Sequence, residues 1–172
     1  LRGRLARRRA DWKDARACFE RAQEIAEVAE LYDVAARSIA GLAGVSRETG
    51  NLPAARRDFG EALVRAQTSG DRDSVAFVHH GLLGLEYDAG DLPSALEHGW
   101  VAVAMYQSDV ERMRCLASLA GALMAYGDRE AAEDAWSVVA SACEERYYQV
   151  FAYDALSHLA ALRGDRREFA AR

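Results

Sequence analysis

The feature that most constrains the fold is a two-residue sequence motif, called the repeated phrase below, that recurs five times along the 172-residue chain. It reads Ala10-Asp11, Gly50-Asn51, Gly90-Asp91, Gly127-Asp128 and Gly164-Asp165, at intervals of 40, 40, 37 and 37 residues. Each copy stands between an apolar segment with helical periodicity and an alanine-rich one. Self-similarity at such a period is typical of stacked repeat proteins, whose units bury their apolar faces only against neighbours. The repeat therefore predicts an all-α solenoid and a binding surface.

The residues of the phrase predict a helix, a tight turn and a second helix in each unit. Glycine can adopt the left-handed conformation that ends a helix, and an Asp or Asn side chain can accept a hydrogen bond from the first N–H groups of the next. Pro53 and Pro93 fall in the first turn of a second helix, where the missing N–H of proline costs little. We expect second helices to begin near Asp11, Asn51, Asp91, Asp128 and Asp165.

Composition and charge narrow the class of protein. Hydrophobic residues make up 51% and charged residues 28% of the chain, and its apolar runs are far shorter than the roughly 20 residues of a membrane span. We expect a cytoplasmic protein without a membrane partner. Residues 1–70 carry 13 basic and 10 acidic side chains, whereas residues 71–172 carry 9 and 17. Because the net charge is −5 and the basic residues form no continuous patch, direct nucleic-acid binding is not expected.

Catalytic and metal-binding patterns are absent from the sequence. Cys18, Cys115 and Cys143 are widely spaced without a CxxC pair, and we expect them to be buried and reduced. His79 and His80 are adjacent on a predicted helix and so point about 100° apart, which prevents both from holding one ion from one face. The chain also carries no nucleotide-binding glycine loop, HExxH or GxSxG motif. We expect no enzyme activity, no metal and no cofactor.

The residues on either side of the phrase resemble the tetratricopeptide repeat (TPR). The second unit matches through Leu42, Ala43, Gly50, Asn51, Ala55, Phe59 and Ala62, and the fourth through Leu119, Ala120, Gly127, Asp128, Ala132 and Trp136. The third unit places Gly99 where the aromatic residue is expected, with Trp100 beside it, which leaves its packing register open. The resemblance implies a right-handed superhelical solenoid of antiparallel helix pairs, with about five repeats and truncated terminal ones.

The repeats are longer than the common TPR and predict a particular subtype. We divide the chain into units at 1–29, 30–70, 71–107, 108–145 and 146–172, all within a single TPR-like domain. Repeats of this length are similar to those of kinesin light chains and of bacterial signalling and transcription regulators. The arginine bias, with one lysine in the chain, favours the bacterial relatives. We expect a regulatory or scaffolding segment of a longer signalling protein.

The resemblance implies that the first helices of successive units line a concave groove. Helical spacing places the following residues on that face: Arg37, Gly44, Arg47, Phe77, His80, Gly84, Tyr87, Arg114, Gly121, Met124, Asp154 and His158. Phe151 continues the stripe in the fifth unit. Glycine holds its centre in three units although it costs roughly 1 kcal/mol relative to alanine in a helix. Two explanations stay open: close packing of another helix, or close approach of a ligand backbone.

The side chains of this stripe favour a protein or peptide partner. Arg37, Arg47 and Arg114 could hold an acidic or amphipathic peptide by bidentate pairing, or could instead pair with acids of the chain itself. Binding of a chaperone tail is not expected, because the one asparagine lies in a turn and the one lysine on a second helix. The sequence predicts a non-catalytic peptide-binding module. The alternative is self-association, as in a homodimer, or packing against another domain.

Overall fold

The fold is a single stack of α-helices, seen in a computed structural model that describes residues 2–163, without the side chains of Arg2, Arg4 and Arg8. The described residues form nine helices and no β-strand. They are α1 (Arg2–Arg8), α2 (Trp12–Val28), α3 (Tyr32–Glu48), α4 (Leu52–Ser69), α5 (Arg72–Ala89), α6 (Leu92–Met105), α7 (Asp109–Tyr126), α8 (Arg129–Ala142) and α9 (Arg146–Leu162). None of these helices is both long and apolar enough to cross a bilayer.

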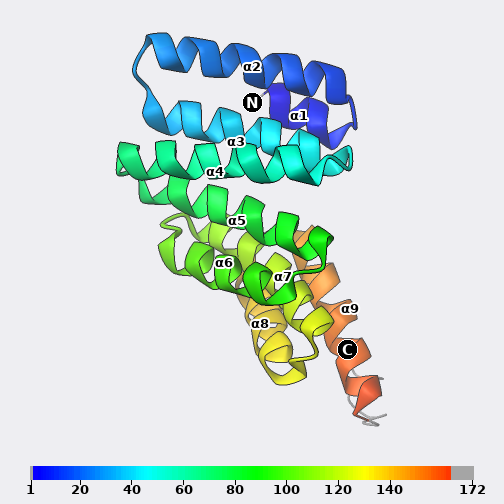
Figure 1. The fold of residues 1–172 in the computed structure, drawn as a ribbon. Helices are drawn as coiled ribbons and strands as arrows, with labels where there is room; N and C mark the ends of the chain where they lie inside the picture. The colour runs from blue at the N-terminus through cyan, green and yellow to red at the C-terminus, as the bar shows by residue number, and fades with distance from the viewer. Residues whose placement is uncertain (1, 164–172) are drawn as a thin grey trace.

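The helices form two layers. Each helix packs against the next one along the chain, and the first helices α1, α3, α5, α7 and α9 also contact one another in sequence, whereas the described second helices make no such contacts among themselves. Figure 1 shows that α2, α3 and α4 run across one end of the molecule, whereas α9 descends steeply at the other. The stack therefore turns along its length, and the predicted all-α solenoid of helix pairs is confirmed.

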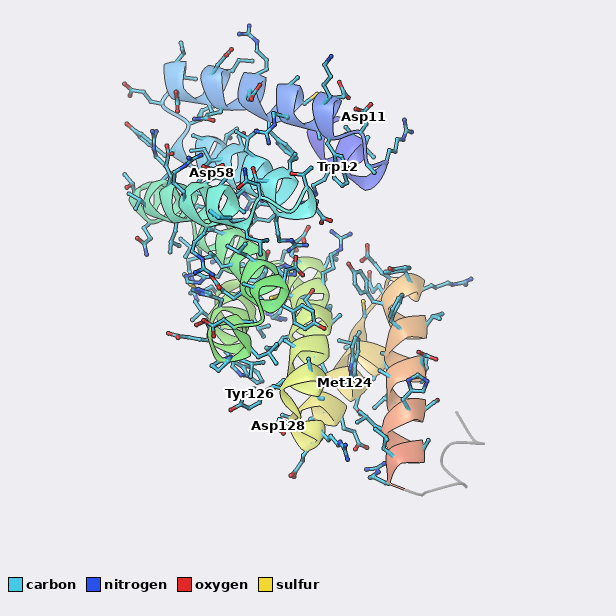
Figure 2. The ribbon with its side chains drawn as sticks, turned by 45° about the vertical axis from the view of Figure 1, so that its right-hand side comes forward. Asp11, Trp12, Asp58, Met124, Tyr126 and Asp128 are labelled. Carbon is cyan, nitrogen blue, oxygen red and sulfur yellow. The ribbon has the colours of Figure 1, made fainter. Side chains whose placement is uncertain are left out.

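The repeated phrase forms the turn inside each unit, as predicted. Asp11, Asn51, Asp91 and Asp128 each accept a hydrogen bond from the backbone N–H three residues later, at 3.1–3.3 Å, and so cap α2, α4, α6 and α8. Asp11 and Asp128 mark two of these turns in Figure 2. The residue before each cap has a positive φ, 80° at Gly50 and 57° at Ala10. The fifth predicted start, Asp165, lies outside the described residues.

The core runs between the layers and depends on small residues of the second helices. Ala15, Ala55, Ala95 and Ala132 are all fully buried. The Phe59 ring of α4 occupies the space where a Cβ on Gly81 of α5 would stand. Trp136 is buried in the core of the last two units and donates its indole N–H to Met124 Sδ at 3.3 Å. Neighbouring units are thus joined by large side chains seated on small ones.

The third unit reaches the same packing with different residues. Gly99 of α6 is buried, and a Cβ there would lie 2.6 Å from a methyl carbon of Leu83 and from one of Leu119. These two leucines fill the space that an aromatic residue fills in the other units. Trp100 is half exposed, so it does not substitute for the missing ring. The register of the third unit therefore matches that of its neighbours.

The cysteines only partly follow the sequence-based expectation. All three are free thiols, and Cys115 and Cys143 are buried. Burial raises the pKa of the Cys115 thiol to about 12, so this thiol stays protonated at neutral pH. The expected burial is wrong for Cys18, which is only partly buried and donates to Asp14 Oδ1 at 3.8 Å. Its place near the end of the stack leaves it fewer covering helices.

Candidate peptide-binding groove

A groove with a cavity volume of about 620 Å³ runs along the first helices. Most of its lining comes from α3, α5, α7 and α9, with Arg7 of α1 at one end and Phe59 and Trp136 reaching in from second helices. Eight predicted residues line it: Gly44, Arg47, Phe77, His80, Gly84, Tyr87, Arg114 and Gly121. The first helices therefore converge on one hollow surface.

Four predicted residues lie outside this lining. Arg37 of α3 donates to Ser74 Oγ at 2.9 Å, lies 3.6 Å from Asp71 and stacks over the Phe77 ring at 5.6 Å. Met124 is held against Trp136 in the core. Asp154 and His158 are exposed on α9 without lining the groove. Whether any of the twelve residues binds a partner stays a prediction.

The arginines of the groove are paired with acids of the chain itself. Arg47 lies 3.1 Å from Glu48 and 3.2 Å from Asp88, and its Nε atom is buried without a hydrogen bond. Arg114 donates to Glu145 Oε2 at 2.8 Å and to Glu111 Oε1 at 2.9 Å. The hydrogen bonds to Glu145, together with the nearby carboxylates, raise the pKa of the Arg114 guanidinium. An acidic ligand would have to displace these internal partners.

The glycine floor is covered in two places by arginine side chains. The Arg7 guanidinium occupies the space where a Cβ on Gly44 would stand, and that of Arg47 does the same over Gly84. Neither explanation left open by the sequence, a packed helix or a ligand backbone, included these arginine side chains. At Gly121, in contrast, no atom of the described residues outside its own stretch of helix lies within 4 Å of the Cβ position.

His80 places a polar side chain on the groove floor. Its Nε2 atom lies 3.1 Å from Ser118 Oγ, and its Nδ1 atom lies 3.5 Å from the Tyr106 hydroxyl. Ser118 also donates to the Arg114 carbonyl at 3.2 Å, so its oxygen can accept from a neutral imidazole. Burial is the main cause that lowers the pKa of His80 to about 4, a value that includes the opposing effect of Glu111 and the smaller lowering effect of the neighbouring arginines. His80 is therefore neutral at pH 7.

Sequence reasoning missed part of the lining. Tyr147 and Tyr148 of α9 border the groove beside Phe151, which the predicted stripe included, and the Tyr147 ring lies 5.0 Å from Phe151 and 5.2 Å from Tyr148. Tyr147 is 66% exposed, and Phe151 is 51% exposed. A signal was present, because these residues recur at helical spacing ahead of Asp154. Exposed aromatic rings bordering a hollow are typical of protein-binding surfaces.

A second feature outside the groove also escaped prediction. His79 of α5 and His98 of α6 bring their Nδ1 atoms to 3.0 Å, a distance that suits an N–H···N hydrogen bond. Burial, helped by the nearby His98, lowers the pKa of His79. Among the residues that the structure describes, no group of three or more His, Cys, Asp or Glu could hold a metal ion. The pair is explained by a contact between two helices of one unit.

Comparison with known proteins shows the fold. No family model matches the chain, and no curated protein does. A crystal structure from Podosopora anserina, described as a kinesin light chain with nearly identical TPR-like repeats, matches with a TM-score of 0.71 at 16% identity. The match covers 98% of this chain and 87% of that one. A variant of the same protein matches with a TM-score of 0.72 at 17% identity, over 98% and 86% of the two chains.

The similarity is one of fold. The chain has the fold of TPR-like repeats, and the kinesin light chain resemblance expected from the long repeats is confirmed at the level of fold. Repeat solenoids of this kind create extended concave surfaces.

Proposed function

We propose that this chain is a non-catalytic peptide-binding module whose groove holds a segment of a partner protein. The observation that carries the proposal is the 620 Å³ groove on the first helices, bordered by the exposed rings of Tyr87, Tyr147 and Phe151. Aromatic and arginine side chains are enriched at the centres of protein interfaces, where they supply large contact areas. We place this module in a cytoplasmic bacterial signalling protein as a regulatory or scaffolding part.

The charges of the groove favour an amphipathic segment over an acidic one. Arg47 and Arg114 already have carboxylate partners, so an acidic peptide would gain ion pairs only by breaking existing ones. The apolar face of an amphipathic segment can contact the rings without disturbing these pairs. Self-association through the same surface is the second candidate, because the chain is basic in residues 1–70 and acidic in residues 71–172.

A pull-down with matched variants tests the groove. The groove variant is Phe151→Glu, and the control is Trp100→Glu, which changes an equally exposed aromatic residue on α6 outside the groove. Proteins captured from a lysate of the source organism are then titrated in purified form against both variants. We expect the groove variant to lose a partner that the control retains. Equal binding to both, with both folded by circular dichroism, would move the site elsewhere.

The self-association candidate has its own measurement. Sedimentation velocity of the wild-type chain distinguishes a monomer from a dimer across a range of concentrations. A dimer that becomes monomeric in Phe151→Glu and persists in Trp100→Glu would favour self-association through the groove. A monomer at all concentrations supports the binding of a separate partner.

A further inference from the structure

A glycine stands at the same place on the groove floor in three successive units. Gly44, Gly84 and Gly121 stand at equivalent places on α3, α5 and α7, and in the first two cases an arginine from the preceding first helix lies over the glycine. Arg47, which covers Gly84, also lies 3.2 Å from Asp88, four residues after that glycine. The unit therefore combines a glycine, a guanidinium above it and a carboxylate beside it.

The third copy of this arrangement has lost both charged members. The residue that corresponds to Arg7 and Arg47 is Tyr87, and the residue that corresponds to Asp88 is Ala125. Tyr87 lines the groove but does not cover Gly121, and the Cβ position of that glycine meets nothing in the described part of the chain outside its own stretch of helix. The first two recesses are filled from within, whereas the third is an open recess of apolar and uncharged groups.

The surroundings of the Gly121 recess select what can enter it. Tyr87, Ala117 and Trp136 line the same groove, and Phe151 continues the apolar surface onto α9. Two charged groups of the lining, Arg47 and Arg114, form ion pairs with Asp88 and Glu111, which also line the groove. A charged side chain would find no unmatched opposite charge among these pairs. A large apolar side chain would bury its surface against rings and a bare helix backbone.

We propose that the recess over Gly121 receives a large apolar side chain from an amphipathic helix of a partner protein. This inference rests on the proposed peptide-binding function and specifies its anchor. The incoming side chain takes the place that Arg7 and Arg47 take over the first two glycines. A helix suits the groove because it presents apolar side chains on one face at every third or fourth residue, so that one enters the recess while others contact the rings of α9.

A peptide-display selection provides the probe. Random 16-residue peptides are selected on the wild-type chain, and the winners are labelled and titrated by fluorescence anisotropy. We expect the selected peptides to carry Leu, Met, Phe or Trp at positions i and i+4 or i and i+7. Gly121→Leu fills the recess and is expected to weaken binding at least tenfold. The matched control is Gly60→Leu on α4, where a Cβ also meets nothing within 4 Å and the groove is not touched, and there binding stays within twofold.

A second variant rebuilds the arrangement of the first two recesses. Tyr87→Arg with Ala125→Asp restores the guanidinium and the carboxylate and is expected to cover Gly121, with the same loss of binding. If circular dichroism shows that Gly121→Leu does not fold, this double variant tests the recess in its place. Unchanged affinity in the folded recess variants, or a failure to select any helical peptide, would overturn the inference.

The outcomes separate this inference from the broader proposal. Peptides that lose affinity in Phe151→Glu but not in Gly121→Leu would retain the groove as a binding site and exclude the recess as its anchor. Selected peptides rich in Asp and Glu would replace the apolar occupant with an acidic one. A wild-type dimer that Gly121→Leu dissociates would identify a second copy of this chain as the occupant. Affinity that survives every groove variant would reject both proposals.

Discussion

The second unit (α3 and α4) and the third (α5 and α6) share a turn, a cap and buried alanines, but they differ where they face the core and the groove. Three pairs of equivalent residues carry the difference: Phe59 and Gly99, Ala40 and His80, Arg47 and Tyr87. The helices of the two units begin at equivalent residues despite these exchanges, although α6 has 14 residues and α4 has 18. The turn and the small contact residues therefore set the architecture, and the remaining positions are free to shape a surface.

The exchange of Phe59 for Gly99 in the core preserves close packing, because the large and the small residues change sides of the helix contact. In the second unit the large Phe59 ring lies on Gly81 of the next first helix. In the third unit the small residue, Gly99, belongs to the second helix, and Leu83 and Leu119 supply the volume. Protein interiors are close-packed, so a large residue on one side requires a small one on the other. Either order satisfies that requirement.

The largest expected effect tests this exchange. Phe59→Ala removes a ring that the neighbouring glycine cannot replace, and we expect the free energy of unfolding to fall by about 3–5 kcal/mol. Trp100→Ala in the third unit is the matched control and should cost less than about 1 kcal/mol, because this ring is 49% exposed. Urea unfolding followed by circular dichroism gives both values. Similar losses in the two variants would contradict the assigned roles of the two aromatic residues.

The sequence was sufficient to predict the local structure. It was insufficient to predict which side chains of one helix contact a given residue on another. The caps at Asn51 and Asp91 and the burial of Ala55 follow from rules that act within a few residues. Leu83, in contrast, fills the space beside Gly99 from a different helix. Helical periodicity assigns a residue to a face but does not specify which neighbour reaches it. The partner of Gly99 was therefore left open.

The same reason explains why the sequence predicted the residues of the groove better than their contacts. Periodicity placed eight of twelve predicted residues along the lining, but the reach of long side chains decided their surroundings. Arg47 crosses from α3 to cover Gly84 on α5, a contact between residues 37 positions apart. Arg114 pairs with Glu145, which follows α8, rather than with Asp154 on α9. The position of a guanidinium depends on several rotatable bonds that no sequence spacing constrains.

The next largest effect concerns His80, which replaces Ala40 in the third unit. Burial lowers the pKa of His80 to about 4 in the folded chain, against about 6.5 when it is exposed. Below pH 6.5 the unfolded chain takes up a proton that the folded chain does not, so acidification destabilises the fold until about pH 4. At 1.36 kcal/mol per pKa unit, we expect His80 to contribute a loss of about 2–3 kcal/mol between pH 7 and pH 4.5.

His80→Ala copies the second unit and isolates this contribution. Urea unfolding at pH 7 and pH 4.5 gives the acid-induced loss of stability for wild type and variant. The variant should lose about 2–3 kcal/mol less than the wild type, because the other groups that titrate in this pH range are present in both. Equal losses would mean that His80 is solvated and titrates normally in the folded chain.

The smallest effect compares the two kinds of groove floor directly. Gly121→Ala adds a methyl group where nothing in the described chain lies within 4 Å, so the gain from a better helix former should appear in full, at about 0.5–1 kcal/mol. Gly84→Ala gives α5 a methyl group that must displace the Arg47 guanidinium. That displacement weakens the ion pair with Asp88, which is worth about 0–1 kcal/mol at this half-exposed site. We expect the two terms to cancel at Gly84, and thermal unfolding of the two variants in parallel measures the difference. An equal gain at both glycines would show that Arg47 does not rest on the floor in solution, and the contrast between a filled and an open recess would disappear with it.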